Sequence, residues 1–296
     1  MWRHVMERKT ITFKFEGDLE GVSVDTFTAA LLGYSRAVQA SARELDPNTV
    51  IDVEITATRP GCLEAILQAV VKDLPGILGA LSQTSDQLEP VLSAFKGYLE
   101  LRRFLGKNGA PKSVERVGDG ISVTAGNNSV INITQNVYKV SGSNEVDSAV
   151  SSMFGALADN EKIGGLSISG NGVDDFESSR DDFEDIRTAP KCETEQERDV
   201  VMKQQHLNVA KPVLEYSDKR KWELYWNGQK LSANMGDFDF LGQLARRERT
   251  FGIGDDMIAD LLLRQRRNEI GAWENKSVRI TKVHDLKPAP EDQKLL

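Results

Sequence analysis

Apolar and polar residues alternate in two stretches near the N-terminus, as they do in half-buried strands. These stretches are residues 10–16, TITFKFE, and residues 50–58. Between them, apolar residues over 27–45 recur with the spacing of one helix face, after a candidate N-cap at Asp25. The turn-forming residues 59–61, Arg-Pro-Gly, favour a hairpin that continues as a strand to residue 71. A helix over 62–71 is the alternative.

A longer apolar stripe runs from residue 74 to 105. Its members alternate in steps of four and three, which is the period of a helix that packs along its whole length. Pro90 interrupts the stripe, so two helices that meet near residues 84–89 are expected. The stripe either covers the face of the N-terminal sheet or mediates a contact between subunits. The candidate contact residues are Leu78, Leu81, Leu88, Leu92, Phe95 and Leu99.

Residues 118–143 are rich in Gly, Asn, Ser and Thr and carry few charges. They predict strands over 121–124 and 130–140, joined by a turn at 125–128. Weakly charged strands pair readily with further strands, so this β-ribbon is a second candidate contact with another chain. A hairpin within one domain is the simpler interpretation.

The following segment mixes short elements with acidic residues. A helix is expected over 146–157 and a strand over 165–169. Residues 174–185, DDFESSRDDFED, lack the spacing of a calcium loop and predict a solvated acidic helix or linker. A mobile connection is expected from there to about residue 199.

The C-terminal part predicts mainly strands. Its strongest short signal is Asn227-Gly228, the preferred dipeptide of a two-residue hairpin turn. The expected elements are strands over 222–226, 229–235, 257–266 and 277–283 and a helix over 237–249.

These patterns predict an α+β protein with three segments and a tail. Residues 1–110 form an N-terminal βαββα-like layer, and residues 111–190 form a middle β-ribbon and helix with an acidic linker. Residues 191–287 form a β-rich small barrel or curled sheet, and residues 288–296 form a flexible tail.

Composition narrows the class of protein. The chain has 296 residues and a net charge of −8, which argues against a uniformly basic nucleic-acid binder. Its two cysteines, Cys62 and Cys192, lie in unrelated contexts and favour a reducing compartment. The N-terminus lacks a secretory signal, and no stretch is apolar enough to span a membrane. We therefore expect a cytoplasmic protein, with residues 1–5 as a candidate dispensable extension.

Candidate chemistry is sparse. The three histidines have no metal-binding motif around them, no catalytic residue can be named and no cofactor is implied, so an enzymatic activity is left open. A cation site is one interpretation of four carboxylates near two turns, and helix capping and turn formation are the other. The four are Asp237, Asp239, Asp255 and Asp256.

Basic residues gather near the C-terminus beside several aromatic residues. Such a combination can neutralise phosphates and stack bases, as in proteins that bind single strands. The candidates are Arg246, Arg247, Arg249, Arg264, Arg266 and Arg267. An ordinary solvated surface is the alternative, because residues 195–285 hold 16 Lys or Arg and 15 Asp or Glu.

The stretches TITFKFEG, VIDVEITATRPGCLEAIL, WELYWNGQKL, FGIGDDMIADLLLRQ and VRITKV follow one another along the chain. In this order the chain resembles a loose group of uncharacterised bacterial and mobile-element α+β proteins. The resemblance covers most of the chain but rests on turns and strands, so it implies no catalytic residues and no defined activity. It implies a role in phage defence or phage–host conflict.

Three functions are consistent with these observations. The leading hypothesis is a non-enzymatic, self-assembling interaction or scaffold protein that binds copies of itself or another protein. The first alternative is a nucleic-acid-binding module that uses the C-terminal arginines. The second is a metal-dependent enzyme at the aspartate cluster.

Overall fold

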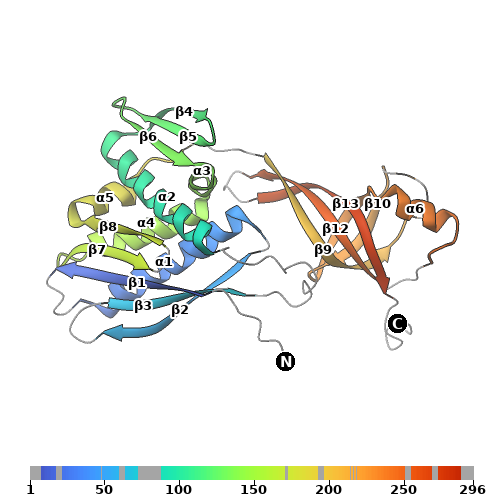
Figure 1. The fold of residues 1–296 in the computed structure, drawn as a ribbon, viewed down its shortest axis with the longest axis horizontal. Coiled ribbons are helices and arrows are strands. Elements are labelled where there is room, and N and C mark those ends of the chain that lie inside the picture. Colours follow the sequence, from blue (N-terminus) through green and yellow to red (C-terminus); the bar gives the residue numbers. More distant parts are fainter. Residues whose placement is uncertain are drawn as a thin grey trace. The chain divides into compact units, whose positions relative to one another are not determined.

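The structure is a computed structural model that describes residues 8–17, 22–47, 49–59, 64–72, 88–170, 173–192, 197–213, 215, 217, 219–250, 255–268 and 273–287 (Figure 1). These residues form two compact units, unit 1 from residue 8 to 192 and unit 2 from residue 197 to 287. Unit 1 combines sheets with helices and unit 2 is mostly strands, so the expected α+β class is confirmed.

The division into units differs from the three expected segments. Buried side chains from residues 11–105 and from residues 121–192 belong to one hydrophobic cluster, so the middle segment is part of unit 1. The boundary expected at residue 191 lies close to the start of unit 2. The expected extension at 1–5 and the tail at 288–296 lie outside the described residues.

A five-stranded antiparallel sheet forms one layer of unit 1. Its strands are, in spatial order, β2 (Val50–Arg59), β3 (Glu64–Lys72), β1 (Arg8–Gly17), β7 (Ile163–Gly170) and β8 (Val173–Ser179). The strands β2 and β3 are antiparallel neighbours, which confirms the expected hairpin. The alternative helix over residues 62–71 is therefore wrong.

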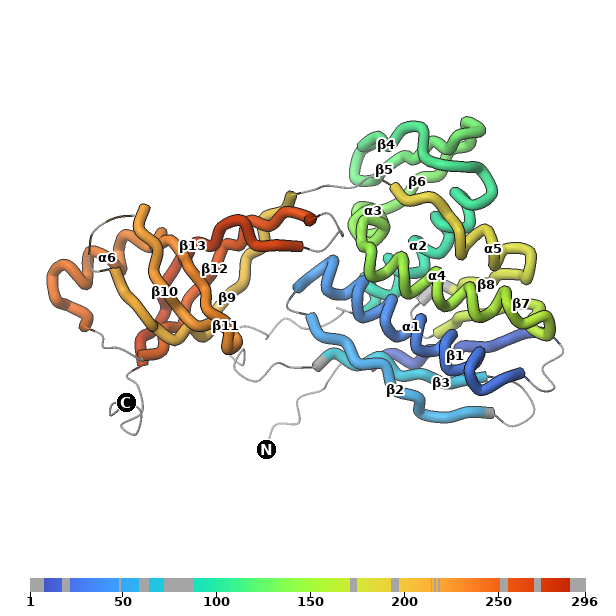
Figure 2. The backbone as a smooth tube through the Cα atoms, turned by 180° about the vertical axis from the view of Figure 1, so that it is seen from behind, coloured from blue at the N-terminus to red at the C-terminus, as the bar shows by residue number. Residues whose placement is uncertain are grey.

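Helices pack on this sheet and on one another (Figure 2). The helices α1 (Val24–Leu45), α2 (Leu88–Asn108) and α5 (Arg180–Thr188) contact strands, and α4 (Asn144–Ala158) packs against α1 and α5. The helix α1 begins after Ser23, whose hydroxyl accepts the N–H of Thr26 at 3.1 Å. Ser23 is thus the N-cap instead of the expected Asp25, which lies in the first turn.

Aromatic side chains join the sheet to the helices. Phe13 of β1 contacts Phe15 and Tyr34 edge-to-face, with ring centroids 5.3 and 5.4 Å apart. Tyr34 of α1 contacts Phe95 of α2 in the same way at 5.5 Å. Each such pair contributes about 0.5–1.5 kcal/mol beyond the burial of its area. The interface between sheet and helices is therefore well specified.

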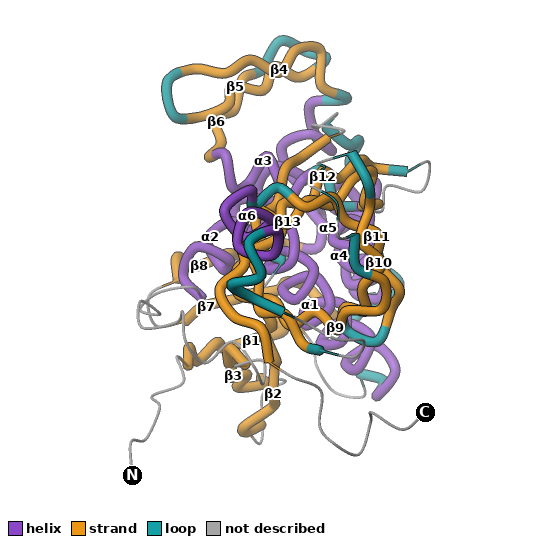
Figure 3. Tube along the Cα trace, turned by 90° about the vertical axis from the view of Figure 1, so that its right-hand side faces the viewer, coloured by secondary structure: helices purple, strands orange, loops and turns teal. Residues whose placement is uncertain are grey.

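A second sheet of unit 1 contains three antiparallel strands and is separate from the first (Figure 3). Its strands are β4 (Pro111–Val117), β5 (Gly120–Ala125) and β6 (Val130–Thr134), and α3 (Gln135–Ser141) follows directly. The strand expected over 130–140 therefore ends at Thr134. The hydroxyl of Thr134 accepts the N–H of Val137 at 3.3 Å and so caps α3, in which Val137 and Val140 are buried.

The acidic residues 174–185 are a structured part of unit 1: they do not form a linker, and the expected helix forms only from Arg180 onward, with one face buried. They span the end strand β8 and the start of α5. Phe176 and Phe183 are buried between the acidic residues and anchor both elements in the core. Ser179 and Asp182 form a capping box at the start of α5.

Unit 2 is a closed five-stranded barrel. Its strands are β9 (Glu197–Lys211), β10 (Lys221–Trp226), β11 (Gln229–Met235), β12 (Asp256–Arg267) and β13 (Trp273–Lys287), and they close in the order β10-β11-β13-β12-β9. The strands β11 and β13 are parallel, and the other pairs are antiparallel. The barrel was one of the two arrangements expected from the sequence.

Two turns of the barrel illustrate its local chemistry. Asn227 and Gly228, with φ angles of 48° and 76°, form the expected hairpin turn between β10 and β11. The helix α6 (Phe238–Ala245) connects β11 and β12 and ends earlier than expected. Arg246 is its C-cap and Arg247 adopts a left-handed φ of 61°, which ends the helix.

Candidate nucleic-acid interface

The outward surface of β10 and β11 carries polar and charged side chains in a regular pattern. Trp222, Leu224, Ala233 and Met235 are buried in the barrel, so the residues that alternate with them point outward. The outward residues are Lys221, Glu223 and Tyr225 on β10 and Lys230, Ser232 and Asn234 on β11.

Strand register extends this surface to β9 and β13 in cross-strand rows. One row contains Lys221, Asn234 and Arg279, and another contains Asn208, Tyr225 and Lys230. Between these rows, Lys211 of β9 lies opposite Glu223. We name this surface the barrel face, and it consists of Asn208, Lys211, Lys221, Glu223, Tyr225, Lys230, Ser232, Asn234 and Arg279.

Positive charge predominates on the barrel face. It contains four cationic side chains, from Lys211, Lys221, Lys230 and Arg279, and one acidic side chain, from Glu223. The Nζ of Lys230 lies 2.8 Å from Oε2 of Glu223. The hydrogen bond and charge of Lys230 lower the pKa of Glu223, and the same contact raises the pKa of Lys230. Glu223 therefore stays ionised and offsets one of the four positive charges.

One aromatic ring lies among these charges. The side chain of Tyr225 is 46% exposed, so its ring can stack on a flat ligand. Asn208 and Asn234 place neutral amide groups in the flanking rows, and the amide of Asn208 donates to Asp256. The barrel face thus combines cations, a stacking platform and neutral hydrogen-bonding groups.

The arginines expected from the sequence lie elsewhere, and two of them form ion pairs across the ladder of β12 and β9. The Nε of Arg264 lies 3.2 Å from Asp199, and the Nε of Arg266 lies 3.3 Å from Glu197. These carboxylates offset the charge that would attract a phosphate. The expected phosphate-binding role of Arg264 and Arg266 is therefore not supported.

Arg267 is held by an aromatic contact at the same end of β12. Its guanidinium lies 4.3 Å from the ring centroid of Trp273, and that of Arg198 lies 4.2 Å from the same ring. Cation–π contacts of this kind fix the two guanidinium groups and the indole together. The contact between Arg267 and Trp273 thus connects β12 and β13. The ring of Trp273 is in contact with two guanidinium groups, so it is not the open stacking platform that the sequence suggested.

The remaining arginines follow α6, which lies at the opposite end of the barrel from the end of β12 (Figure 1). Arg246 pairs with Glu248, with its Nε 2.6 Å from the carboxylate. Arg247 is exposed and Arg249 half-buried. The six arginines are split between the two ends of β12 and do not form the single basic patch that the sequence suggested.

The aspartate cluster is also divided. The carboxylate of Asp237 accepts the N–H of Phe240 at 2.9 Å and that of Val283 at 2.8 Å, so it caps α6 and joins it to β13. Asp239 is exposed in the first turn of α6, and Asp256 accepts a hydrogen bond from Asn208. Within the described ranges, no three His, Cys, Asp or Glu side chains are placed to hold a metal ion. Asp255 is buried and its backbone carbonyl accepts the N–H of Val209, so the geometry does not support the expected cation site at Asp237, Asp239, Asp255 and Asp256.

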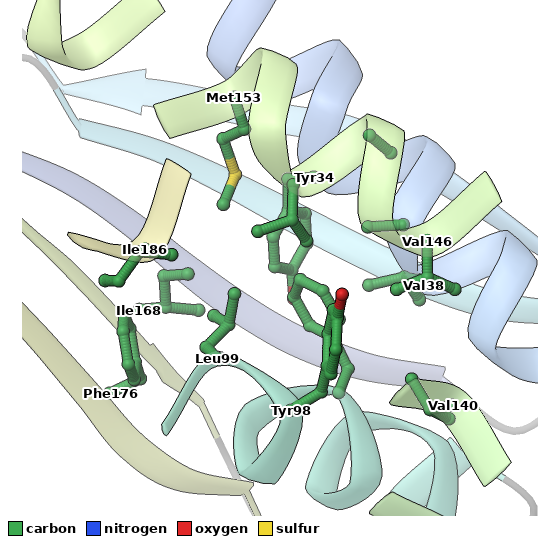
Figure 4. Packing of buried hydrophobic residues seen from close by; sticks show 14 of the residues in the cluster. Tyr34, Val38, Tyr98, Leu99, Val140, Val146, Met153, Ile168, Phe176 and Ile186 are labelled. Atoms are coloured by element: carbon green, nitrogen blue, oxygen red, sulfur yellow. The ribbon is translucent and has the colours of Figure 1, made fainter. Parts of the chain in front are cut away.

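The apolar stripe of residues 74–105 is covered by unit 1 itself where it is described. Leu88, Leu92, Phe95 and Leu99 are each at most 3% exposed, and they pack in the core of α1, α2 and the sheet. Figure 4 shows Leu99 between Tyr98, Ile168 and Ile186. From residue 88 to 105, where it is described, the stripe therefore covers the sheet and leaves no apolar surface for a second subunit. The other two candidates, Leu78 and Leu81, lie outside the described residues.

The sequence contained part of the signal for the barrel face. The alternation in KWELYW places Lys221 and Tyr225 on the face opposite Trp222, and the hairpin then positions Lys230. Arg279 could not be added in this way, because it reaches the face through the parallel pairing of β11 with β13.

No family model matches the chain, and no curated protein or solved structure gives a significant match. The resemblance to uncharacterised bacterial proteins and the role in phage defence stay predictions. Among the described helices, none has both the length and the apolar character needed to cross a lipid bilayer.

Proposed function

We propose that unit 2 binds single-stranded nucleic acid along the barrel face. The observation that carries this proposal is the cross-strand arrangement of Lys221, Asn234 and Arg279 beside the exposed ring of Tyr225. Cations that follow a backbone and an aromatic ring that stacks on bases are the two features of single-strand recognition. The neutral amides add hydrogen bonds to base edges.

The topology supports the same ligand class. A five-stranded barrel with this strand order, a parallel pairing of its third and fifth strands and a helix before the fourth has the connectivity of the OB-fold. In that fold the second and third strands, here β10 and β11, carry the face that binds oligonucleotides or oligosaccharides. Topology alone does not decide between these ligands. The excess of positive charge on the barrel face favours the phosphodiester.

Charge is distributed unevenly between the two parts of the chain. Residues 197–287 contain 17 Lys or Arg and 14 Asp or Glu, a net charge of +3. Residues 1–196 contain 19 Lys or Arg and 29 Asp or Glu, a net charge of −10. The acidic composition of the whole chain therefore comes from the part before unit 2. Nucleic acid is expected to bind at the barrel face and to dissociate readily as salt screens a small number of contacts.

The deciding experiment measures fluorescence anisotropy of labelled single-stranded DNA and RNA of about 12 nucleotides, a length within the usual site size of one barrel. The test variant is Lys221→Gln/Arg279→Gln. We expect binding of wild type at about 50 mM salt and a loss of affinity of about tenfold or more in the variant.

The matched control is Arg264→Gln/Arg266→Gln, which removes the same charge from the ion-paired end of β12. We expect this control to change affinity by less than about threefold, because the lost charges are already offset by carboxylates. Equal losses in both variants would indicate a non-specific charge effect and contradict the proposal. Absence of binding by wild type at low salt would also contradict it.

A second pair of variants tests stacking. Replacement of Tyr225 by Ala removes the ring, and we expect about 5- to 150-fold weaker binding, because a stacked base contributes about 1–3 kcal/mol. Tyr225→Phe keeps the ring and should retain the affinity. If Tyr225→Phe weakens binding as much as Tyr225→Ala, the hydroxyl rather than the ring makes the contact, and stacking is ruled out.

A further inference from the structure

One edge strand of unit 1 differs from the others in carrying no charge. The five-stranded sheet ends in β2 and β8, and the three-stranded sheet ends in β4 and β6. Proteins commonly protect such edges with charged residues or proline, because an unguarded edge can pair with another strand. The residues that guard the other three edges are Asp52 and Glu54 on β2, Asp175 and Glu177 on β8, and Pro111, Lys112, Glu115 and Arg116 on β4. The sequence of β6 is VINIT, which contains neither a charged residue nor a proline.

The hydrogen-bond pattern shows which backbone groups β6 presents at its edge. The N–H of Ala125 donates to the carbonyl of Ser129 at 2.8 Å, so these residues form a hydrogen-bonded pair at the end of the β5–β6 hairpin. Such pairs alternate along an antiparallel ladder, so Ile131 and Ile133 bond to β5. The backbone groups of Val130 and Asn132 and the N–H of Thr134 therefore point to the free edge, whereas the carbonyl of Thr134, as the N-cap, accepts the first hydrogen bond of α3. In the described part of the chain, β5 is the one strand that pairs with β6.

The sequence of β6 is nearly symmetric about its central residue. Asn132 is flanked by Ile131 and Ile133, and these are flanked by the β-branched residues Val130 and Thr134. An antiparallel pairing of β6 with an identical strand, centred on Asn132, would place each residue opposite one of similar size and polarity. It would also use the backbone groups that point to the edge, because Asn132 would face Asn132 and Val130 would face Thr134.

We propose that two copies of this chain associate through their β6 strands, antiparallel and about a two-fold axis at Asn132. The absence of charge favours this partner over a different protein, because a two-fold axis brings like residues close together and a charged strand would repel its own copy. Val130, which is 55% exposed, becomes covered by the partner's Thr134. This inference is independent of nucleic-acid binding by unit 2.

The symmetry gives a direct test by analytical ultracentrifugation of the full chain. Asn132 is exposed, so Asn132→Lys and Asn132→Glu are expected to fold normally, which circular dichroism checks. Each variant alone would place like charges face to face across the axis and should be monomeric. An equimolar mixture of the two variants should recover the dimer, because opposite charges then meet.

Ser122→Lys is the matched control, since Ser122 lies opposite Asn132 on the central strand β5. It adds the same charge without altering the edge, and we expect the dimer to persist. A wild-type protein that stays monomeric up to about 100 µM would overturn the proposal. Loss of the dimer in Ser122→Lys, or failure of the mixed variants to associate, would point to contact through the sheet's outer face and overturn the pairing of edges.

Discussion

The guanidinium group of Arg102 donates a hydrogen bond to the carboxylate of Asp147 in the interior of unit 1. Arg102 lies on α2 and Asp147 on α4. The Nε of Arg102 also donates to the carbonyl of Ile186 at 2.6 Å, and its Nη2 donates to that of Arg187 at 2.7 Å. One side chain that is only 3% exposed therefore joins α2, α4 and α5.

Replacing Arg102 by Met should lower the free energy of unfolding by about 2–4 kcal/mol, because the carbonyl of Ile186 loses its buried partner, while Asp147 keeps Lys191 and the carbonyl of Arg187 keeps Ser151. Urea denaturation followed by circular dichroism measures this change. The control is Arg43→Met, which breaks an exposed ion pair with Glu145 and should lower the free energy by at most about 1 kcal/mol. Similar losses in the two variants would show that Arg102 contributes no more than a surface pair.

Protonation of Asp182 should make unit 1 less stable at acid pH. Burial raises the pKa of Asp182, but hydrogen bonds from Lys107 and Ser179 and the charge of Lys107 outweigh this effect, so its pKa is lowered. The stability that a lowered pKa contributes is present above the unfolded-state value of about 3.9 and is lost as pH falls through the folded-state value.

Asp182→Asn should therefore flatten the decrease in melting temperature between about pH 5 and pH 2. Asp181→Asn removes the same charge from an exposed neighbour that forms no capping box and serves as the control. If Asp182→Asn and wild type lose stability with the same pH dependence, this carboxylate does not contribute to acid sensitivity.

Two helical glycines of unit 1 should respond in opposite directions to alanine. A Cβ at Gly106 would lie 2.2 Å from the carbonyl oxygen of Asp185, so Gly106→Ala should lower stability by about 1–3 kcal/mol as α2 and α5 separate. A Cβ at Gly155 would have its nearest neighbour, in Arg187, at 3.6 Å. Gly155→Ala should therefore raise stability by up to about 1 kcal/mol through helix propensity. Thermal unfolding of both variants checks the signs, and a stabilising Gly106→Ala would refute the close approach.

In the barrel, Asp237→Ala should lower stability by about 2–3 kcal/mol, because both the cap of α6 and the bond to the N–H of Val283 are lost. Asp239→Ala, in the exposed first turn of the same helix, should change stability by less than about 0.5 kcal/mol. Thermal unfolding with and without magnesium completes the measurement. A magnesium-dependent rise in melting temperature that Asp237→Ala abolishes would restore the cation site that the geometry argues against.

Elements that depend on neighbouring residues were predictable from the sequence. The alternation at residues 10–16 became β1, the Asn227-Gly228 dipeptide became the turn of the barrel hairpin, and residues 146–157 became the centre of α4. In each case the signal lies within at most about twelve consecutive residues. The helix at Leu88–Asn108 was predictable for the same reason, but the side chains that bury it come from distant strands and helices.

The candidate site depended on long-range pairing and was predicted only in part. The ion pairs of Arg264 and Arg266 with β9 removed two residues that looked suitable in the sequence. The parallel pairing of β11 and β13 added Arg279 beside Asn234. A strand's outward neighbours are set by which strands flank it, and no local pattern contains that information.

The bend in β9 determines how unit 2 can be divided. At Gln204 the backbone takes a φ of 50° and its N–H donates to Asp260 at 2.8 Å. The part of β9 up to residue 208 pairs with β12, and the part from residue 208 onward pairs with β10. A fragment that begins at residue 219 would lose both pairings at once and expose two unprotected strands to aggregation. Any truncated protein meant to carry the barrel alone must therefore retain the chain from residue 197.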